Sequence, residues 1–145
     1  MNDSFVTIGK SMKKVDGLAI VRGKPAYTPD YDMLDALVVK LLRSPHAHAI
    51  IRSIDSSQAL SIPGVVGIFT YQDVERVPYT RAGQGYPEPS PYDTYLLDRK
   101  VRYVGDPVAV VAATTEKAAL KALRKIKVEY ETLDAVFDMK EASKE

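Results

Sequence analysis

The 145-residue chain has no cysteine, almost no net charge and no long apolar run. Without cysteine it cannot form disulfides, hold zinc or iron–sulfur clusters through thiolates, or use a cysteine nucleophile. Its 20 basic and 19 acidic side chains leave a net charge of +1, which indicates neither a nucleic-acid partner nor a membrane partner. No apolar stretch approaches the ~18 residues of a membrane span, and MNDSFVTIGK lacks the layout of a signal peptide. We therefore expect a cytoplasmic protein.

The overall composition is typical of a globular domain, with 46% hydrophobic and 27% charged residues. A single domain of this length buries roughly 70% of the surface that its unfolded chain exposes, so it can build a core without disulfides. Residues 1–15 are polar and weakly patterned, and we expect an N-terminal arm there. The remainder shows neither a repeat nor a linker, which predicts one domain.

The first half of that domain is predicted to alternate short helices and strands. DGLAIVRG, residues 16–23, is typical of a helix ended by Gly23. Apolar residues occupy both faces of 34–44, which predicts a buried strand, and 48–55 predicts a second strand that pairs with it. Asp55 or Ser56 is expected to cap a short helix that Pro63-Gly64 ends, ahead of a strand over 65–70.

The second half carries the clearest pattern. Residues 107–114 are almost continuously apolar, which is typical of a buried strand. Residues 114–126 predict a helix whose apolar face consists of Ala118, Ala119, Ala122, Leu123 and Ile126. Alternation in 127–131 predicts a strand with Val128 and Tyr130 inward. The two strand–helix–strand units favour an α+β or α/β fold over an all-β fold.

The two histidines of the chain offer the first candidate site. His46 and His48 lie two positions apart, which places both on one face of a strand, as in a metal pair. They follow Pro45 at the start of a strand, however, and no carboxylate has the spacing of a further ligand. A turn packed against its neighbours is favoured, with a small metal-dependent enzyme as an alternative.

Three other patterns suggest a binding or catalytic site, but each lacks a residue that such a site requires. Asp30, Asp32 and Asp35 miss the EF-hand loop, because Asp35 stands where that loop needs glycine. Gly83-Gln84-Gly85 lacks the third glycine and the helix of a dinucleotide fingerprint. No serine lies in a G-x-S-x-G setting. The residues of this chain therefore predict a domain without an active site of its own.

One segment stands apart from the globular pattern, the stretch GQGYPEPSPYD at residues 83–93. Its prolines occur at every second position between tyrosines. Since proline fixes φ and has no N–H, the segment can form neither a helix interior nor a central strand, and we expect extended backbone. The spacing of two also differs from the P-x-x-P of SH3 ligands.

Five segments together resemble a known family in order and spacing, from about Lys10 to Ala142. They are GKPAYTPD (23–30), LLRSPHAHAIIRSID (41–55), S-x-A-L-x-I-P-G-V (57–65), RKVRYVGDPVAVVAATTEKAALKA (99–122) and VEYETLDAVFD (128–138). They resemble the a/b hammerhead domain that opens the molybdenum-binding subunit of the xanthine dehydrogenase and aldehyde oxidase family. The loop variant is most similar to the bacterial, purine-hydroxylating branch of that family that is sometimes called selenium-dependent.

The resemblance implies an α+β fold over residues 16–138, with a mixed sheet, two main helices and a long Pro/Tyr-rich loop. Residues 139–145 would then begin the connection to a molybdopterin-binding region. SPHAHA, 44–49, becomes a structural turn between paired strands, and Gly105 with Pro107 a tight start to a buried strand. Asp106 stands where many relatives carry glutamine or glutamate, with an effect that the sequence leaves open.

The resemblance also implies where the chemistry lies. Enzymes of this family oxidise aldehydes or purines at a molybdenum–molybdopterin centre and pass electrons through iron–sulfur clusters to FAD. Their catalytic and cofactor-binding residues belong to other regions, so we expect none in this chain, neither catalytic, cofactor-binding nor metal-binding. The expected role is that of a structural domain, inactive alone. A free-standing adaptor module that binds a partner through its 78–97 loop is the alternative.

The proline–tyrosine loop, residues 78–97, is the predicted contact with other domains. Extended proline segments lose little entropy on docking, and tyrosine supplies both area and a hydrogen bond. The expected partners are the molybdopterin-binding catalytic region and the iron–sulfur and flavin domains or subunits. The candidate contact residues are Tyr79, Tyr86, Pro87, Pro89, Pro91, Tyr92 and Tyr95.

Overall fold

The computed structural model describes residues 7–24, 27, 28, 31, 33, 35–81 and 90–144. The chain divides into two compact units, residues 1–36 and 37–145. In the first unit, helix α1 spans Gly17–Val21, and none of its residues is buried. Gly23 follows the helix with a φ of 64°, and its N–H donates to Ile20 O at 3.0 Å. The predicted short helix and its glycine stop are confirmed.

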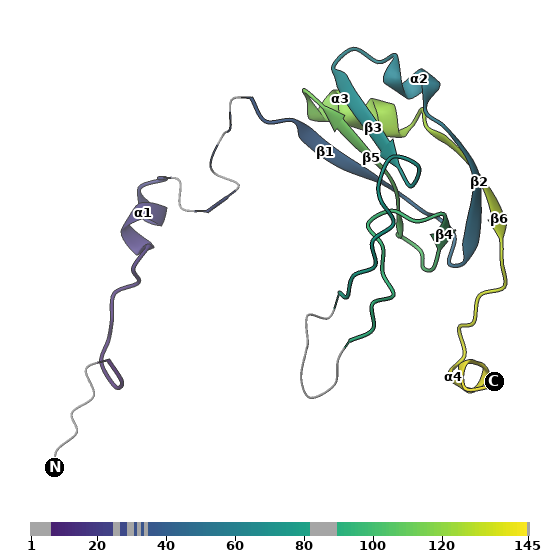
Figure 1. Ribbon diagram of the computed structural model, residues 1–145. Helices are drawn as coiled ribbons and strands as arrows, with labels where there is room; N and C mark the ends of the chain where they lie inside the picture. Colours follow the sequence, from purple (N-terminus) through teal and green to yellow (C-terminus); the bar gives the residue numbers. More distant parts are fainter. Residues whose placement is uncertain are drawn as a thin grey trace. The chain divides into compact units, whose positions relative to one another are not determined.

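The second unit contains two three-stranded sheets (Figure 1). In the first sheet, β5 (Pro107–Ala113) lies between β1 (Val38–Arg43) and β3 (Val65–Thr70). In the second sheet, β2 (Ala49–Asp55) lies between β4 (Lys100–Val101) and β6 (Lys127–Thr132). All these strand pairs are antiparallel. The predicted α+β class is confirmed, but the strands form two antiparallel sheets where one mixed sheet was expected.

Short helices join the two sheets. Helix α2 (Ser57–Leu60) leads from β2 to β3, and helix α3 (Glu116–Leu123) leads from β5 to β6, so each connects one sheet to the other. The predicted strand–helix–strand segments are present, but their strands are not neighbours. A parallel crossover needs a dozen or more residues, and the connection through α2 is shorter than that. A last helix, α4, spans Met139–Ala142. None of the helices in the described ranges has the length or apolar content of a membrane span.

Strands β1 and β2 do not pair with each other, so that prediction is wrong. The turn between them is bonded to both sheets instead. Ser44 N donates to Asp106 O at 2.9 Å and Gly105 N donates to Ser44 O at 2.8 Å, which continues the pairing of the first sheet. His48 O accepts from Leu133 N at 2.9 Å, beside the second sheet. These non-local bonds commit the two ends of the turn to different sheets.

Helix α3 covers one face of the first sheet through small side chains. Thr115 caps the helix, since its Oγ1 accepts from Ala118 N at 3.2 Å. Alanines let the helix approach the sheet closely, where packing is dense. The buried set consists of Ala118, Ala119, Ala122 and Ile126 from the α3 side, Ala109, Val111 and Ala113 from β5, and Ala59 from α2. The predicted apolar helix face is confirmed, with Leu123 partly buried at its edge.

The opposite face of the first sheet, which we call the open face, is exposed along its two outer strands, whereas Val110 and Ala112 of the central strand β5 are half-buried and buried. Alternate residues of a strand point to opposite faces, and the strand register defines two rows on this one. The rows are Leu41, Val110 and Phe69, and Val39, Ala112 and Gly67. Val39 is 56% exposed, Phe69 47% and Leu41 36%. The prediction that residues 34–44 are buried on both faces is therefore wrong, because the described part of the chain covers only one.

Candidate functional site

A short antiparallel bridge closes the base of the proline–tyrosine loop. Tyr79 N donates to Thr94 O at 2.8 Å, and Thr94 N donates to Tyr79 O at 3.2 Å. The Thr94 hydroxyl also donates to Asp93 Oδ1 at 3.2 Å. These bonds tie the two ends of the loop together. The base of the loop is therefore held by backbone hydrogen bonds within the second unit.

The predicted contact residues differ in what the structure says of them. Tyr86, Pro87 and Pro89 lie outside the described residues. Tyr92 is 70% exposed, Tyr79 is 39% exposed and Pro91 is exposed, whereas Tyr95 is half-buried. Contact of these seven residues with another domain stays a prediction.

Tyr95 lies close to two guanidinium groups. The Arg76 guanidinium carbon is 3.7 Å from the centroid of the Tyr95 ring, and that of Arg102 is 5.6 Å from it. A cation over the face of a tyrosine is attracted by the ring quadrupole. Tyr95 thus joins the end of the loop to residues before it and after it in the chain.

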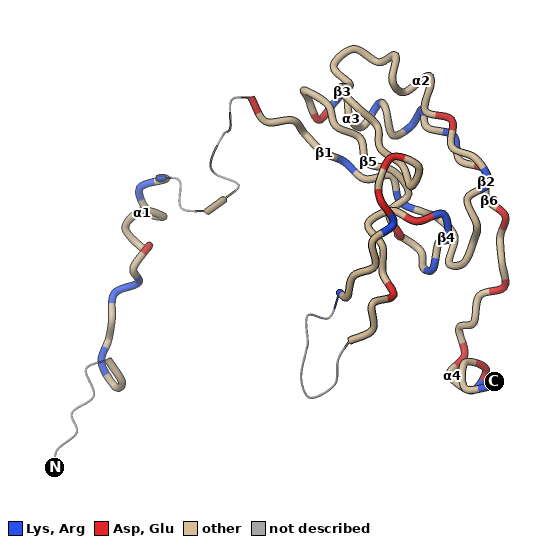
Figure 2. Tube along the Cα trace, viewed as in Figure 1, with Lys and Arg blue, Asp and Glu red and all other residues tan. Residues whose placement is uncertain are grey.

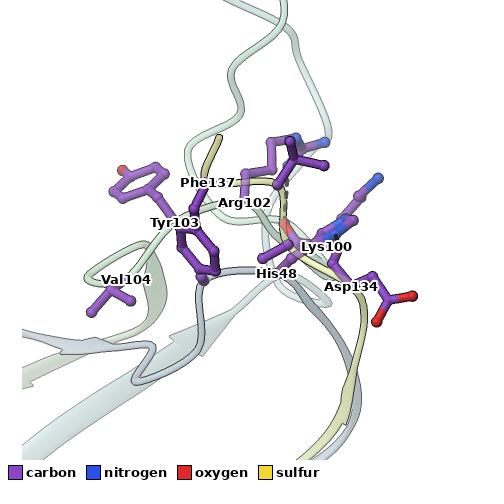
Figure 3. Close-up of a pocket in the computed structure, with 10 residues that line it drawn as sticks. His48, Lys100, Arg102, Tyr103, Val104, Asp134 and Phe137 are labelled. Carbon is purple, nitrogen blue, oxygen red and sulfur yellow. Dashed lines mark hydrogen bonds between the residues drawn. The ribbon is translucent and has the colours of Figure 1, made fainter. Parts of the chain in front are cut away.

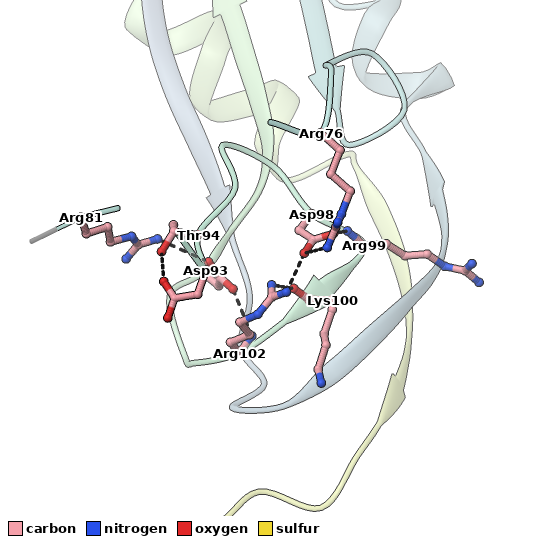
Figure 4. Close-up of polar contacts among 9 residues, drawn as sticks. Arg76, Arg81, Asp93, Thr94, Asp98, Arg99, Lys100 and Arg102 are labelled. Atoms are coloured by element: carbon pink, nitrogen blue, oxygen red, sulfur yellow. Dashed lines mark hydrogen bonds and ion pairs between the residues drawn. The ribbon is translucent and has the colours of Figure 1, made fainter. Parts of the chain in front are cut away.

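Asp98 is the acceptor that holds these arginines (Figure 4). Arg76 Nε lies 3.2 Å from Asp98 Oδ1, and Arg102 Nη2 lies 2.8 Å from Oδ2. The backbone N–H of Arg99 donates to Oδ1 at 2.8 Å. The side chain is only 10% exposed, and burial alone would raise its pKa. The hydrogen bonds from Arg76 and Arg102 outweigh burial and hold the pKa of Asp98 below its usual value. We call Arg76, Tyr95, Asp98 and Arg102 the Asp98 cluster.

Asp106 fastens the turn between β4 and β5. Its Oδ2 accepts from Arg102 N at 3.0 Å, and Arg81 Nη2 lies 3.9 Å from its Oδ1. The Arg81 guanidinium also lies over the Tyr103 ring, 5.0 Å from its centroid. Gly105, with a φ of 95°, supplies the backbone conformation that lets the turn close. The role that the sequence left open for Asp106 is thus to hold this turn.

The turn SPHAHA uses its side chains internally. Ser44 Oγ accepts from His46 N at 3.0 Å. The His46 ring meets the Tyr130 ring edge-on at 4.8 Å, and burial raises the pKa of Tyr130. His48 Nδ1 lies 2.6 Å from Asp134 O. Because a carbonyl can only accept, Nδ1 is the donor and carries the proton. Within the described ranges no three metal-ligating side chains gather. The segment is a structural turn, although it joins strands of different sheets.

A cavity of about 470 Å³ lies where three distant segments of the second unit meet (Figure 3). It is lined by residues 47–48, 100, 102–104 and 134–137. Apolar side chains, among them Phe137, 85% exposed, and Val104, 65% exposed, share it with the cations Lys100 and Arg102. Sequence reasoning missed this site, because its residues are far apart in the chain and form no local motif. Such a surface can receive an apolar group from a partner.

Comparison with known proteins identifies the domain. Residues 22–134 match the family "Aldehyde oxidase and xanthine dehydrogenase, a/b hammerhead domain". The probable hypoxanthine oxidase XdhD of Escherichia coli K12 is 46% identical over 143 residues, which are 99% of this chain and 15% of that protein. The nicotinate dehydrogenase large molybdopterin subunit of Eubacterium barkeri is 36% identical over 145 residues, 100% of this chain and 33% of that subunit.

A solved structure agrees with these relatives. The aldehyde oxidoreductase from Desulfovibrio desulfuricans superimposes with a TM-score of 0.80 at 28% identity, covering 93% of this chain and 16% of that one. The chain therefore spans only a small part of each relative. The resemblance seen in the sequence is confirmed, and the chain belongs to the aldehyde oxidase and xanthine dehydrogenase a/b hammerhead domain family.

Proposed function

We propose that this chain is a structural domain at the N-terminal end of the catalytic subunit of a molybdenum hydroxylase. It contributes scaffold and interdomain contacts and does not catalyse alone. Residues 1–15 form its arm, 16–138 the hammerhead domain and 139–145 the start of the connection to the molybdopterin-binding region. A purine is the substrate class that we favour over an aldehyde, because a probable hypoxanthine oxidase is 46% identical to this chain.

The observation that carries this proposal is the open face of the first sheet. Contiguous exposed apolar side chains on a flat surface mark places where another protein surface packs. Fully burying one large aliphatic or aromatic side chain contributes roughly 1.5–3 kcal/mol. Val39 and Phe69, each about half exposed, have therefore realised only part of that stabilisation. The much longer relatives contain further polypeptide that can cover such a face.

The cavity in Figure 3 offers a second surface of the same kind. Its wall is held in place, since Leu133 N donates to His48 O at 2.9 Å and His48 Nδ1 donates to Asp134 O at 2.6 Å. Beyond these bonds, Val136 is 60% and Phe137 85% exposed. A fixed wall that ends in exposed apolar side chains suits contact with a neighbouring domain.

The cofactors of the parent enzyme would be bound outside this chain. We expect a molybdenum–molybdopterin centre, iron–sulfur clusters and FAD in other domains or subunits, and a cytoplasmic location. The chain lacks cysteine and so cannot ligate an iron–sulfur cluster through thiolates, and we place the binding of molybdopterin and FAD in the other domains as well. No step of the oxidation is therefore assigned to a residue of this chain.

The experiment that tests the proposal is capture of the native complex through a tag on this chain, followed by measurement of its mass and molybdenum content. Molybdenum in a much larger assembly is expected. A Leu41→Lys variant, which places a charge on the open face, should lose most of that assembly. The matched control is Leu120→Lys on α3, where the leucine is 41% exposed beside charged residues. Equal recovery with both variants, or an assembly without molybdenum, would count against the proposal.

An adaptor module is the second candidate, favoured by the anchored loop base and the exposed Tyr92. In that case Tyr92→Ala should abolish binding of a partner that contains no molybdenum, while Leu41→Lys leaves it intact. The molybdenum hydroxylase proposal predicts the reverse: Leu41→Lys should reduce the captured assembly more than Tyr92→Ala does. The two variants therefore separate the candidates in one experiment.

A further inference from the structure

Strand β1 is an edge strand of the first sheet. It pairs with β5 on one side, and no strand of the described chain pairs with it on the other. An edge strand presents backbone N–H and C=O groups to which a further strand can bond. The bonds of the neighbouring strands show which residues of β1 present these groups.

The end of β3 fixes the direction of the backbone groups across the sheet. In an antiparallel pair, residues that bond the partner strand alternate with residues whose N–H and C=O point away from it. Thr70 points away from β5, since its N–H donates to Asp73 Oδ2 at 2.7 Å and its C=O accepts from Asp73 N at 3.0 Å. Its register partner Ala109 therefore points toward β1, and so does Val111 two positions further along β5.

The same alternation on β1 makes Val39 and Leu41 the outward-pointing residues. Lys40 lies opposite Val111 and so bonds β5. The N–H and C=O groups of its two neighbours must then point away from the sheet. The side chains of these neighbours lie on the open face, where Val39 is 56% and Leu41 36% exposed. A strand placed along this edge would meet free backbone groups beside an apolar face.

The other edge strands carry features that discourage such pairing. Strand β4 has only two residues. The register of β3 shifts between Val65 and Gly67, and Asp73 occupies the backbone groups at its far end. Charged residues stand at alternate positions of β6, K-V-E-Y-E-T, and Figure 2 shows charges of both signs along the paired strands β2 and β6.

The charged residues of β1 do not protect its edge in the same way. Lys40 Nζ lies 2.6 Å from Glu116 Oε1 of α3, and Arg43 Nη1 donates to Gly105 O at 2.9 Å. Both charges are therefore engaged within the second unit. The register shift of this strand lies at its last residue, between Leu42 and Arg43. The described chain leaves the rest of the edge available for pairing.

We propose that an extended segment of the polypeptide that completes the enzyme pairs with β1 and enlarges the first sheet, an inference that rests on the proposed function. The outward groups of Val39 and Leu41 specify a strand as the partner, because extended backbone matches their spacing. Side chains of that strand that lie beside these two residues on the open face should be apolar.

The relatives favour a strand from the same enzyme over one from a second copy of this chain. The chain covers 15% of the probable hypoxanthine oxidase to which it is 46% identical, so a relative of that kind contains much further polypeptide. A segment of the same protein is present at a high effective concentration, which a separate copy lacks.

Hydrogen exchange at single residues tests this pairing, because the alternation along β1 supplies its own control. Exchange of the Val39, Lys40 and Leu41 amides is measured by mass spectrometry in the native enzyme and in the 145-residue chain alone. In the chain alone Val39 and Leu41 should exchange fast, whereas Lys40, bonded to β5, should exchange slowly. In the enzyme we expect the two outward amides to slow by about tenfold or more, with Lys40 still slow.

A proline variant tests the hydrogen bonds themselves. Val39→Pro removes the outward N–H and keeps the bonds to β5, and an edge strand tolerates proline at such a position. Val39→Ala is the matched control, because it shortens the same side chain and keeps the N–H. Capture through a tag should recover about tenfold less assembly with Val39→Pro than with Val39→Ala. Circular dichroism checks that both chains are folded, and the exchange rates of the unmodified enzyme decide without any variant.

Each contrary outcome overturns the pairing. Fast exchange of Val39 and Leu41 in the enzyme would mean that no strand adds to this edge. Equal recovery with the proline and alanine variants would remove the hydrogen-bond basis. Protection in the chain alone that rises with its concentration would assign the edge to a second copy. Molybdenum is measured on the same enzyme: its absence overturns the proposed function, whereas unprotected amides in a molybdenum-containing enzyme overturn the pairing alone.

Discussion

Replacing Asp98 by alanine removes an acceptor that three donors share. Its carboxylate accepts from Arg99 N at 2.8 Å and from Arg102 Nη2 at 2.8 Å, and Arg76 Nε lies 3.2 Å away. The side chain is 10% exposed, so water replaces few of these bonds in the native state. Loss of the carboxylate also frees the two guanidinium groups that lie over Tyr95. We therefore expect Asp98→Ala to loosen the base of the proline–tyrosine loop.

The size of the effect follows from the separate contacts. The backbone N–H of Arg99 loses its acceptor, which costs about 1 kcal/mol, and the contact with the partly exposed Arg102 is worth about the same. Arg76 is well exposed and adds little. The free energy of unfolding should fall by about 2 kcal/mol for Asp98→Ala and by about 1 kcal/mol for Asp98→Asn, which keeps one acceptor oxygen. At roughly 3 °C per kcal/mol for a chain of this size, the Asp98→Ala loss corresponds to a Tm lower by about 6 °C.

The stability lost in Asp98→Ala should also depend on pH, in a direction set by the pKa of Asp98. The folded protein lowers this pKa below its ordinary value of about 3.9. The carboxylate therefore contributes its stability above the unfolded pKa, and the contribution is lost as the pH falls through the folded pKa. The difference in the free energy of unfolding between wild type and Asp98→Ala should therefore be largest at pH 7 and smaller at pH 3.

Urea unfolding followed by circular dichroism at both pH values measures these differences. Asp93→Ala is the matched control, because Asp93 is an exposed carboxylate near the same loop whose side chain accepts from the Thr94 hydroxyl. That control should change the free energy of unfolding by less than about 0.5 kcal/mol. A loss as large for Asp93→Ala as for Asp98→Ala, or a gap that does not change with pH, would refute the reasoning.

Two further predictions concern local geometry. Gly64 has a φ of 90°, and an added Cβ would lie 2.8 Å from the Thr114 hydroxyl, whereas Gly105 has a φ of 95° and open space. Thermal unfolding should therefore show a larger loss for Gly64→Ala, about 2–3 kcal/mol, than for Gly105→Ala, about 1–2 kcal/mol; equal losses would contradict the steric contribution. Hydrogen bonds from the Ser57 hydroxyl and backbone N–H lower the pKa of Asp55, so Ser57→Ala should raise that pKa toward its ordinary value in an NMR titration. The stability that this carboxylate supplies is present above the unfolded pKa and lost as the pH falls through the folded one, and an unchanged pKa in the variant would disprove its assignment to the hydroxyl.

The elements themselves could be predicted, because local patterns determine them. The strand over 65–70 was placed at its observed bounds, the one over 107–114 to within one residue, and the helix over 114–126 contains α3 with its small apolar face inward. Asp55 was foreseen near the start of α2, where its Oδ1 accepts from Ser57 N at 3.0 Å. Periodicity and capping act over a few residues, so the sequence displays them directly.

Pairing and sites depend on contacts between residues far apart, and there the predictions were less complete. The partner of β1 is β5, because Ser44 bonds to residues 105 and 106 and not to the strand that follows it. The Asp98 cluster draws on residues 76, 95, 98 and 102, which share no period. Residues 95, 98 and 102 are near one another in the chain, and residue 76 joins them from the other side of the loop that the Tyr79–Thr94 bridge closes. No local motif marks such an arrangement.

The mistaken expectation for residues 34–44 leads to a final test. The pattern of β1 predicted burial on both faces, and the described part of the chain covers one of them. If the open face is covered only in the complete enzyme, the same isosteric change should have little effect on the open face of the isolated sheet and a large one on the face that α3 covers. Val39, 56% exposed on the open face, and Val111, fully buried against α3, offer that comparison.

In this chain alone, Val39→Thr should alter the free energy of unfolding by less than about 0.5 kcal/mol, since its hydroxyl stays in water. Val111→Thr should lower it by about 1–3 kcal/mol, because the new hydroxyl is buried at an apolar position that offers it no hydrogen-bond partner. In the assembled enzyme Val39→Thr should become costly too, since a covering surface would then exclude water from its hydroxyl. Denaturant unfolding of the chain and thermal inactivation of the enzyme measure the two situations. A Val39→Thr variant that is neutral in both would mean that nothing covers the open face, and the two-sided apolar pattern of β1 would then need another cause.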